Sequence, residues 1–342
     1  MTVVVDASVL IIGGGAVGGV TAALMDGKVR RVAVLDIDRE HVARMRSPGL
    51  RFDELGSERV VTLEAYDSPD QIDGHFDFGL VTLKAPALES ALSPLRGHAD
   101  AFVSLGNGLV QDRVASVVGA DRVIAGTVEL GATNLGPGRV RQTTRNPYVI
   151  GELDGATRPR TELLAAVLGT AADVHVTANI RGQIWSKLLI NSTFSALGAV
   201  SGSLYRDVAA TPEGRRAIVA VWSEGHRVGL AQALALEPVL GIDPADLAAG
   251  SESERARAAI DVVIGHAGAT EASMLQDLRR GRATEVDVIN GAVVQRALTH
   301  NLQAPLNARI VALIHGFERG EGEPSAALLA ELGAETSGNS RR

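Results

Sequence analysis

Short apolar runs of strand length alternate with stretches of helical periodicity over the first half of the chain. The run SVLII at residues 8–12 is continuously apolar, which favours a strand buried on both faces. A helix is expected at residues 17–25, further strands at 32–35, 78–83 and 101–105, and a hairpin or strand pair near an edge at 139–150, opened by Gly136, Pro137 and Gly138. This alternation predicts an α/β fold with a mostly parallel sheet and helices on both faces.

The pattern changes after about residue 178, where strand-like runs largely vanish. Four stretches carry helical periodicity or helix-forming composition, namely residues 184–200, 212–236, 244–272 and 285–300. We therefore predict an α/β domain over residues 1–177, an all-α domain over residues 178–332, and a small, polar, flexible tail over residues 333–342.

A glycine-rich segment, GGGAVGG, directly follows the first predicted strand and places the pattern G-x-G-x-x-G at Gly13, Gly15 and Gly18. Such glycines allow a tight turn, close approach of the backbone to a pyrophosphate, and close packing of helix on strand. The helix N-terminus presents free N–H groups and a partial positive charge to the phosphates. The context predicts a Rossmann-like dinucleotide site that also includes Ala16 and Val17. A merely structural turn is the alternative.

Asp36 stands at the end of the second predicted strand, 18 residues after Gly18. A carboxylate near that spacing accepts hydrogen bonds from the adenosine ribose and would repel a 2′-phosphate, so we expect NAD(H) rather than NADP(H). A solvated turn aspartate is the alternative, and the nearby Asp38 and Arg39 complicate the assignment.

Composition excludes several other classes of function. A net charge of −7 and an aromatic content of 3% argue against a nucleic-acid partner. No apolar run is long enough to cross a membrane, and the first residues lack a basic region, so we expect neither a membrane span nor a signal peptide. The absence of cysteine excludes disulfides and thiolate metal sites and fits a cytoplasmic location. The eight histidines show no paired ligand spacing, so no metal is expected.

Only three of the 33 basic residues are lysines, and two of them, Lys84 and Lys187, lie in apolar stretches. Lysine can lose its proton when it is desolvated, whereas arginine essentially cannot. Lys187, Asn191 and Ser195 recur at every fourth position, which predicts one shared helix face. Burial would lower the pKa of Lys187 towards the range useful for proton transfer. The alternative is a lysine whose ammonium stays in water.

Two other positions, Glu285 and Asn107, are candidates for the site. Glu285 follows Thr284, which with Asp287 predicts a capping box and makes Glu285 the first helical residue after a helix stop at Gly281. Such a pattern is ordinarily only capping. Asn107 lies between two glycines at the end of a predicted strand, where doubly wound folds bind ligands. A tight turn would also explain it.

Five stretches run in order from residue 9 to residue 291: VLIIGGGAVGG, LVTLKAPAL, SLGNGL, NIRGQIWSKLLIN and SMLQDLRRGRATEVDVING. Together they resemble the ketopantoate reductase (2-dehydropantoate 2-reductase) family, and the last two are the most specific. The resemblance implies a Rossmann-like domain followed by a helical domain, with the active site between them. It implies nicotinamide-dependent reduction of a 2-keto acid to the 2-hydroxy acid, as in pantothenate biosynthesis, and suggests a homodimer.

Roles for single residues follow from the resemblance alone. It makes Lys187 the general acid that protonates the substrate carbonyl oxygen, and Glu285 a carboxylate that contacts the substrate and the nicotinamide ribose. Asn191 and Ser273 match substrate contacts. Lys84 and Asn107 match cofactor-side residues, with Asn107 also lining the substrate site.

Two departures from the family leave other functions open. Ser195 stands where the family commonly has an asparagine that helps to hold the substrate, and the segment LDID lacks the arginine of the family's NADP(H) habit. A specialised-pathway reductase for a bulkier keto acid is therefore one alternative. A related hydroxyacid dehydrogenase, which also uses a helix Lys-x-x-x-Asn pair, is another. A non-catalytic NAD(H)-binding sensor is a third, against which the presence of Lys187 and Glu285 argues.

Overall fold

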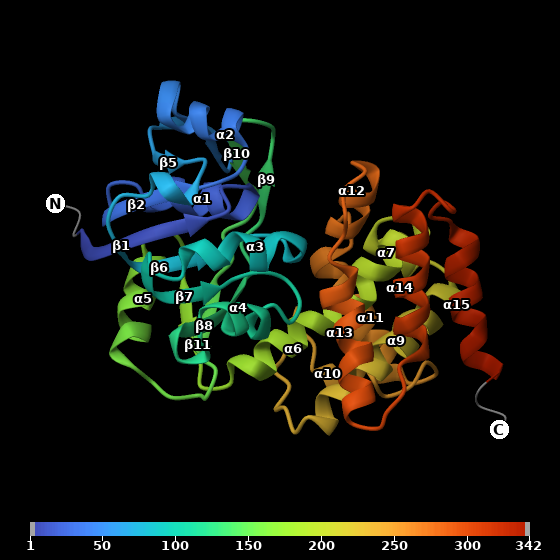
Figure 1. Ribbon diagram of the computed structural model, residues 1–342. Coiled ribbons are helices and arrows are strands. Elements are labelled where there is room, and N and C mark those ends of the chain that lie inside the picture. The colour runs from blue at the N-terminus through green and yellow to red at the C-terminus, as the bar shows by residue number, and fades with distance from the viewer. Residues whose placement is uncertain (1–3, 339–342) are drawn as a thin grey trace. The chain divides into compact units, whose positions relative to one another are not determined.

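The computed structural model describes residues 4–338, and the chain divides into two compact units (Figure 1). The first unit reaches Gly106 and resumes over Val110–Ile180, and the second comprises Asn107–Leu109 together with the chain from Arg181 onward. The division predicted at residues 177 and 178 lies close to the later of these boundaries. The sequence prediction placed residues 107–109 in the first domain, whereas the structure groups Asn107–Leu109 with the second unit.

An eight-stranded sheet forms the centre of the first unit, in the order β12-β11-β8-β7-β6-β1-β2-β5. Its strands are β1 (Val5–Ile12), β2 (Val29–Leu35), β5 (Glu64–Tyr66), β6 (Phe76–Val81), β7 (Ala99–Ser104), β8 (Val123–Val128), β11 (Tyr148–Glu152) and β12 (Val174–Val176). Neighbouring strands are parallel except for β11 and β8. The helices of this unit are α1 (Ala16–Met25), α2 (Arg39–Arg44), α3 (Leu88–Leu92), α4 (Gln111–Val118) and α5 (Pro159–Gly169). The predicted α/β, mostly parallel fold is confirmed.

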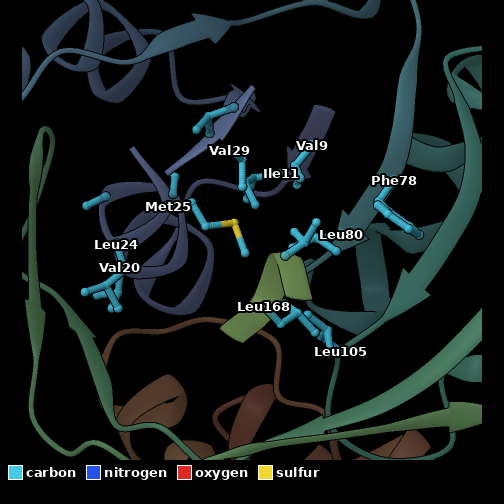
Figure 2. Close-up of a cluster of buried hydrophobic side chains, with 14 of the residues drawn as sticks. Val9, Ile11, Val20, Leu24, Met25, Val29, Phe78, Leu80, Leu105 and Leu168 are labelled. Atoms are coloured by element: carbon cyan, nitrogen blue, oxygen red, sulfur yellow. The ribbon is translucent and has the colours of Figure 1, made fainter. Parts of the chain in front are cut away.

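Strand β1 is buried on both faces, as its continuous apolar run predicts. Val9 and Ile11 belong to a core cluster that α1 and α5 complete from one side of the sheet (Figure 2). Leu10 and Ile12 alternate with them along the strand and are buried on its other face. This double burial fixes the end of β1, from which the glycine-rich segment starts.

A second, four-stranded sheet packs against α1 in the order β4-β3-β10-β9. Its strands are β3 (Leu50–Glu54), β4 (Ser57–Val61), β9 (Ala132–Asn134) and β10 (Arg139–Gln142). The strand pair predicted at residues 139–150 is wrong in its pairing, because β10 lies in this sheet and β11 lies in the larger one. The turn at residues 136–138 joins β9 to β10 instead, and the main partner of β10 is the distant strand β3, which it meets in parallel.

The second unit is helical, and its described residues form no strand beyond two isolated bridges. Its helices are α6 (Ile180–Ile190), which begins one residue before the unit, the π-turn η6 (Asn191–Ser195), α7 (Ala196–Ser201), α8 (Tyr205–Val208), α9 (Pro212–Ala231), α10 (Pro244–Leu247), α11 (Glu254–Ala267), α12 (Ser273–Arg279), α13 (Val286–Thr299), α14 (Pro305–Glu318) and α15 (Ala326–Gly338). This confirms the predicted all-α region. Among the described helices, none is long and apolar enough to cross a membrane.

Several predicted helical bounds differ from the structure; the stretch predicted at 212–236, for example, is helical only to Ala231. The helical stretch predicted at residues 244–272 contains two helices, α10 and α11, with Gly250 at φ +102° between them. The flexible tail expected from Gly333 is helical as far as Gly338, and residues 339–342 lie outside the described residues. A side chain at Gly333 would come within 2.2 Å of the carbonyl oxygen of Glu213, so this glycine lets α15 lie close against the start of α9.

Candidate active site

The glycine-rich segment joins β1 to α1 in the geometry that its three glycines predict. Gly13 has φ +102°, a backbone conformation that the tight turn requires and that glycine adopts readily because it has no side chain. A Cβ on Gly18 would lie 2.0 Å from the oxygen of Gly13 and 2.8 Å from Cγ2 of Ile11, so helix and strand pack directly on each other. A Cβ on Gly15 would meet no atom within 4 Å. The backbone at Gly15 is therefore open to a ligand, at the N-terminus of the helix that starts at Ala16.

Asp36 is bonded to this loop from the end of β2. Its Oδ2 accepts a hydrogen bond from the N–H of Gly14 at 2.7 Å, and its Oδ1 accepts one from the N–H of Asp38 at 2.9 Å. The aspartate is thus a fixed part of the loop structure. Each carboxylate oxygen has more than one acceptor position, so these two bonds leave the group able to receive ribose hydroxyls.

His41, which the sequence prediction missed, ties the same loop to the second sheet. Its Nδ1 accepts a hydrogen bond from the N–H of Gly138 at 2.7 Å, and its Nε2 lies 2.7 Å from the oxygen of Gly14. Because a backbone N–H can only donate, the ring proton sits on Nε2 and is donated to Gly14. A lone histidine carries no sequence signal for this role, since both partners are backbone atoms, one of them 97 residues away.

Lys84 follows β6 by three residues and is exposed, which corrects the apolar surroundings expected from its sequence neighbours. The residues just before it contact the glycine loop. The hydroxyl of Thr82 donates to the oxygen of Gly13 at 2.7 Å, and a Cβ on Gly13 would lie 2.9 Å from Cδ2 of Leu83. Lys84 therefore emerges beside the predicted pyrophosphate site, within the first unit.

In the second unit, Lys187 lies half-buried on α6, and the two residues before it fix that helix. The indole N–H of Trp185 donates to the oxygen of Gly225 on α9 at 3.0 Å. The hydroxyl of Ser186 accepts the N–H of Glu237 at 2.9 Å. These bonds hold the backbone at Lys187 in one position, although its own side chain remains partly accessible.

The helix that carries Lys187 continues at Asn191 as the π-turn η6, which ends at Ser195 and which the sequence did not predict. Lys187 and Asn191 keep the helical spacing up to the start of η6. Ser195 is buried, and its hydroxyl is hydrogen-bonded to the hydroxyl of Tyr205 at 2.5 Å.

Glu285 is buried at the N-cap of α13 and pairs with Asn107. The amide Nδ2 of Asn107 donates to Oε2 of Glu285 at 3.2 Å. The neighbouring Leu109 donates its backbone N–H to the oxygen of Val288 at 3.1 Å, so the short segment Asn107–Leu109 is bound to the start of α13. Two predicted site residues that stand 178 positions apart are thereby in direct contact.

The capping box predicted at this helix is wrong about the side chain that accepts the backbone N–H of Thr284. The N–H of Thr284 donates to Oε1 of Glu318 at 2.7 Å rather than to Asp287, and the helix begins at Val286 rather than at Glu285. Asp287 is bonded instead to Nε2 of His315, whose Nδ1 is bonded to Glu318. The acceptor thus comes from α14, which a local pattern cannot reveal.

Ser273, another predicted substrate contact, is the exposed first residue of α12, and Asp277 is buried one turn later. Gly281, at φ +61°, follows the end of this helix as the expected stop. No group of three potential ligands suited to a metal ion occurs within residues 4–338.

Comparison with known proteins identifies the family. The models named ketopantoate reductase PanE/ApbA and ketopantoate reductase PanE/ApbA C terminal match residues 9–155 and 179–318. The 2-dehydropantoate 2-reductase of Halobacterium salinarum is 29% identical over 315 residues, covering 91% of this chain and 99% of its own. That of Mesorhizobium japonicum is 28% identical over 340 residues, covering 91% and 98%.

Solved structures agree with this assignment. The PanE/ApbA family ketopantoate reductase from Ralstonia eutropha JMP134 superposes with a TM-score of 0.79 at 26% identity, over 92% of this chain and 99% of that one. A D-mandelate dehydrogenase in complex with NADH and anilino(oxo)acetate shares the fold, with a TM-score of 0.80 at 21% identity over 92% and 98%. The chain therefore belongs to the ketopantoate reductase family and is an oxidoreductase of that family.

Proposed function

We propose that this protein reduces a 2-keto acid to the 2-hydroxy acid, with a proton supplied by Lys187. The observation that carries the proposal is a half-buried lysine on a helix whose preceding two residues, Trp185 and Ser186, are hydrogen-bonded in place. Reduction of the keto carbon creates an alkoxide. The ammonium stabilises that developing charge and then donates a proton to it, and the neutral amine regains a proton from solvent.

The residues of the first unit fit a nicotinamide dinucleotide. The open backbone at Gly15, the helix N-terminus behind it and the carboxylate of Asp36 would hold its pyrophosphate and its adenosine ribose. When bound, the cofactor supplies the hydride. Lys84, exposed beside the loop, is placed to add positive charge near the phosphates.

Glu285 would orient the substrate and the nicotinamide ribose by accepting hydrogen bonds from their hydroxyl groups. Its bond from Asn107 fixes the direction of the carboxylate. Asn191, one turn after Lys187, and Ser273 supply further polar groups to the substrate. None of these side chains needs to change its charge during the reaction, so Lys187 remains the proton donor.

The cofactor that this site favours is NAD(H). Asp36 is fixed by two backbone N–H groups at the end of β2, so a 2′-phosphate at the adenosine ribose would meet its carboxylate, while Arg39 lies three residues later as the opposing charge. We expect the ratio of kcat/KM for NADH to that for NADPH to exceed one and to fall in Asp36→Asn. A strong preference of the wild type for NADPH would remove Asp36 from this role.

The activity is tested by a spectrophotometric screen of 2-keto acids with NADH and with NADPH. Ketopantoate is the first substrate to include, because the curated relatives are named 2-dehydropantoate 2-reductases. Oxidation of the reduced cofactor with formation of the 2-hydroxy acid supports the proposal. Binding of NADH without consumption against the whole panel contradicts it. The homodimer and the cytoplasmic location are predictions that light scattering and fractionation test.

A second candidate substrate class is a 2-keto acid with a bulkier side chain. Ser195 is smaller than the asparagine usual in the family, and its hydroxyl is already bonded to Tyr205. We expect Ser195→Asn to lower kcat/KM for the bulkiest acid that is accepted while sparing the smaller ones. An equal loss for all side-chain sizes would count against this candidate.

A further inference from the structure

A chain of buried hydrogen bonds joins α9, α14, α13 and the π-turn η6 inside the second unit. It starts at the carboxylate of Glu224 on α9, passes through the side-chain amides of Asn307 on α14 and Asn290 on α13, and ends at the backbone oxygen of Ser192 in η6. Glu224 is 4% exposed, and the other three residues are fully buried. We call these four residues the amide relay.

We propose that Asn290 is a positioning residue, which acts through η6 to hold Asn191 and Lys187 in register with Glu285. This inference rests on the proposed function, because it assigns a role in that reaction. Asn290 shares α13 with Glu285, which caps the same helix. Its amide reaches η6, the turn that starts at Asn191 and continues the helix of Lys187. One side chain thus connects the two elements that carry the predicted catalytic groups.

The direction of every bond in the amide relay is determined at Glu224. Its Oε1 accepts the N–H of Leu306, and its Oε2 accepts the N–H of Asn307, each at 3.0 Å, so a carboxylate from α9 caps the first turn of α14. The same Oε2 accepts Nδ2 of Asn307 at 2.8 Å. Since the carboxylate accepts, Asn307 must turn its own oxygen towards Asn290.

Asn290 then donates in two directions. Its Nδ2 lies 2.9 Å from Oδ1 of Asn307 and 2.8 Å from the oxygen of Ser192. In η6, the N–H of Ala196 bonds to the oxygen of Asn191, five residues earlier, as expected of a π-turn. The next carbonyl, that of Ser192, receives the amide of Asn290. The relay therefore supplies a partner to the backbone where the helix widens.

The cost of this arrangement indicates that it serves more than packing. Oδ1 of Asn290 is buried and has no hydrogen-bond partner among the described residues. An unpaired buried oxygen is unfavourable, and an apolar side chain of similar volume would avoid it. Using one amide proton to bind η6 and the other to bind Asn307 on α14 accounts for the presence of an amide at this position.

The test is Asn290→Leu, which removes both donors and the unpaired oxygen while keeping the volume similar. We expect kcat to fall about 10- to 100-fold, because misplacement of catalytic groups by about 1 Å has effects of that size. The dissociation constant for NADH, whose predicted pyrophosphate and adenosine contacts lie in the first unit, should stay within about twofold. Amide hydrogen exchange should become faster over residues 193–196, whether or not a substrate is known.

A matched control exists in the first unit. Gln142 is also a buried amide with an unpaired oxygen, so Gln142→Leu makes the same chemical change away from the relay. It should leave kcat and exchange over η6 unchanged. Glu224→Gln should lower kcat as well, because it places donors against the donors of Asn307. Adding Glu224→Gln to Asn290→Leu should lower kcat little further, since both substitutions disrupt the same chain of hydrogen bonds, the amide relay.

The outcomes separate this inference from the proposed function. If the wild type reduces no 2-keto acid, the proposed function fails, and exchange over η6 still decides whether Asn290 holds the turn. Faster exchange with unchanged kcat in Asn290→Leu overturns the positioning role. Unchanged exchange overturns the structural basis of the inference. A loss of kcat that Gln142→Leu reproduces also overturns it, because the effect would then follow from any loss of a buried amide.

Discussion

Replacing Gly18 by alanine tests the geometry of the cofactor loop without any ligand. The new Cβ would lie 2.0 Å from the backbone oxygen of Gly13, about 1.4 Å closer than an ordinary contact, and 2.6 Å from Oγ1 of Thr82. No rotation of a side chain relieves a clash with a backbone oxygen, so α1 must move away from β1. Overpacking costs about 1–3 kcal/mol, and we expect the upper end of that range here.

Thermal unfolding of the cofactor-free protein, followed by circular dichroism, measures this cost. A loss of about 3 kcal/mol in a unit of this size lowers Tm by roughly 6–12 °C. The matched variant is Gly15→Ala, whose Cβ meets no atom within 4 Å. Gly15 is the N-cap of α1, where alanine is somewhat less favourable than glycine, so its Tm should fall by only a few degrees.

Titration with NADH tests the other property of the loop, its affinity for the cofactor, and here Gly15→Ala is the informative variant. Gly15→Ala fills the space through which the pyrophosphate would approach, so the dissociation constant should rise at least about tenfold although the fold is intact. The reasoning fails if Gly18→Ala melts within about 2 °C of the wild type. It also fails if Gly15→Ala binds NADH as tightly as the wild type.

Two further predictions concern stability. A hydrogen bond to Glu318, opposed by partial burial and reinforced by Asp287, raises the pKa of His315. The wild type should therefore have a higher unfolding free energy than His315→Gln. This difference should be complete below about pH 6.5 and should fade as pH rises through the raised pKa of His315. A difference that grows towards about pH 9 would contradict this prediction. Tyr148→Phe removes the buried bond to Thr21 and should cost about 1 kcal/mol in urea unfolding, with much less than additive loss when combined with Thr21→Val; strictly additive losses would show that the two hydroxyls do not interact.

The parts of the fold that the sequence predicted are those specified by neighbouring residues. The apolar run of β1, the glycines after it and the start of α1 are contiguous, so pattern and structure agree. The second sheet was missed because β10 pairs in parallel with β3, nearly ninety residues earlier, and short strands carry no signal of their partner. For the same reason, residues 139–150 were assigned to one strand pair.

The candidate site divides in the same way. Polar residues on an apolar helix were enough to single out Lys187 and Asn191. The π-turn η6, which contains Asn191 and Ser195, was not predicted, and the amide that bonds to its backbone comes from Asn290 on another helix. The acceptor for the N–H of Thr284 was assigned to Asp287 but comes from α14. Each departure involves a tertiary hydrogen bond, which local periodicity cannot report.

The central claim is that Lys187 delivers the proton during reduction of a 2-keto acid, and Lys187→Ala tests it most directly. Turnover of the best keto acid should be compared with NADH binding in the same preparation. Lys28→Ala is the control, since the ammonium of Lys28 donates to the backbone oxygen of Thr170 within the first unit. We predict that Lys187→Ala lowers kcat at least about 100-fold while NADH affinity and Tm stay near the wild-type values. A Lys187→Ala protein that retains a near-normal kcat would contradict the account.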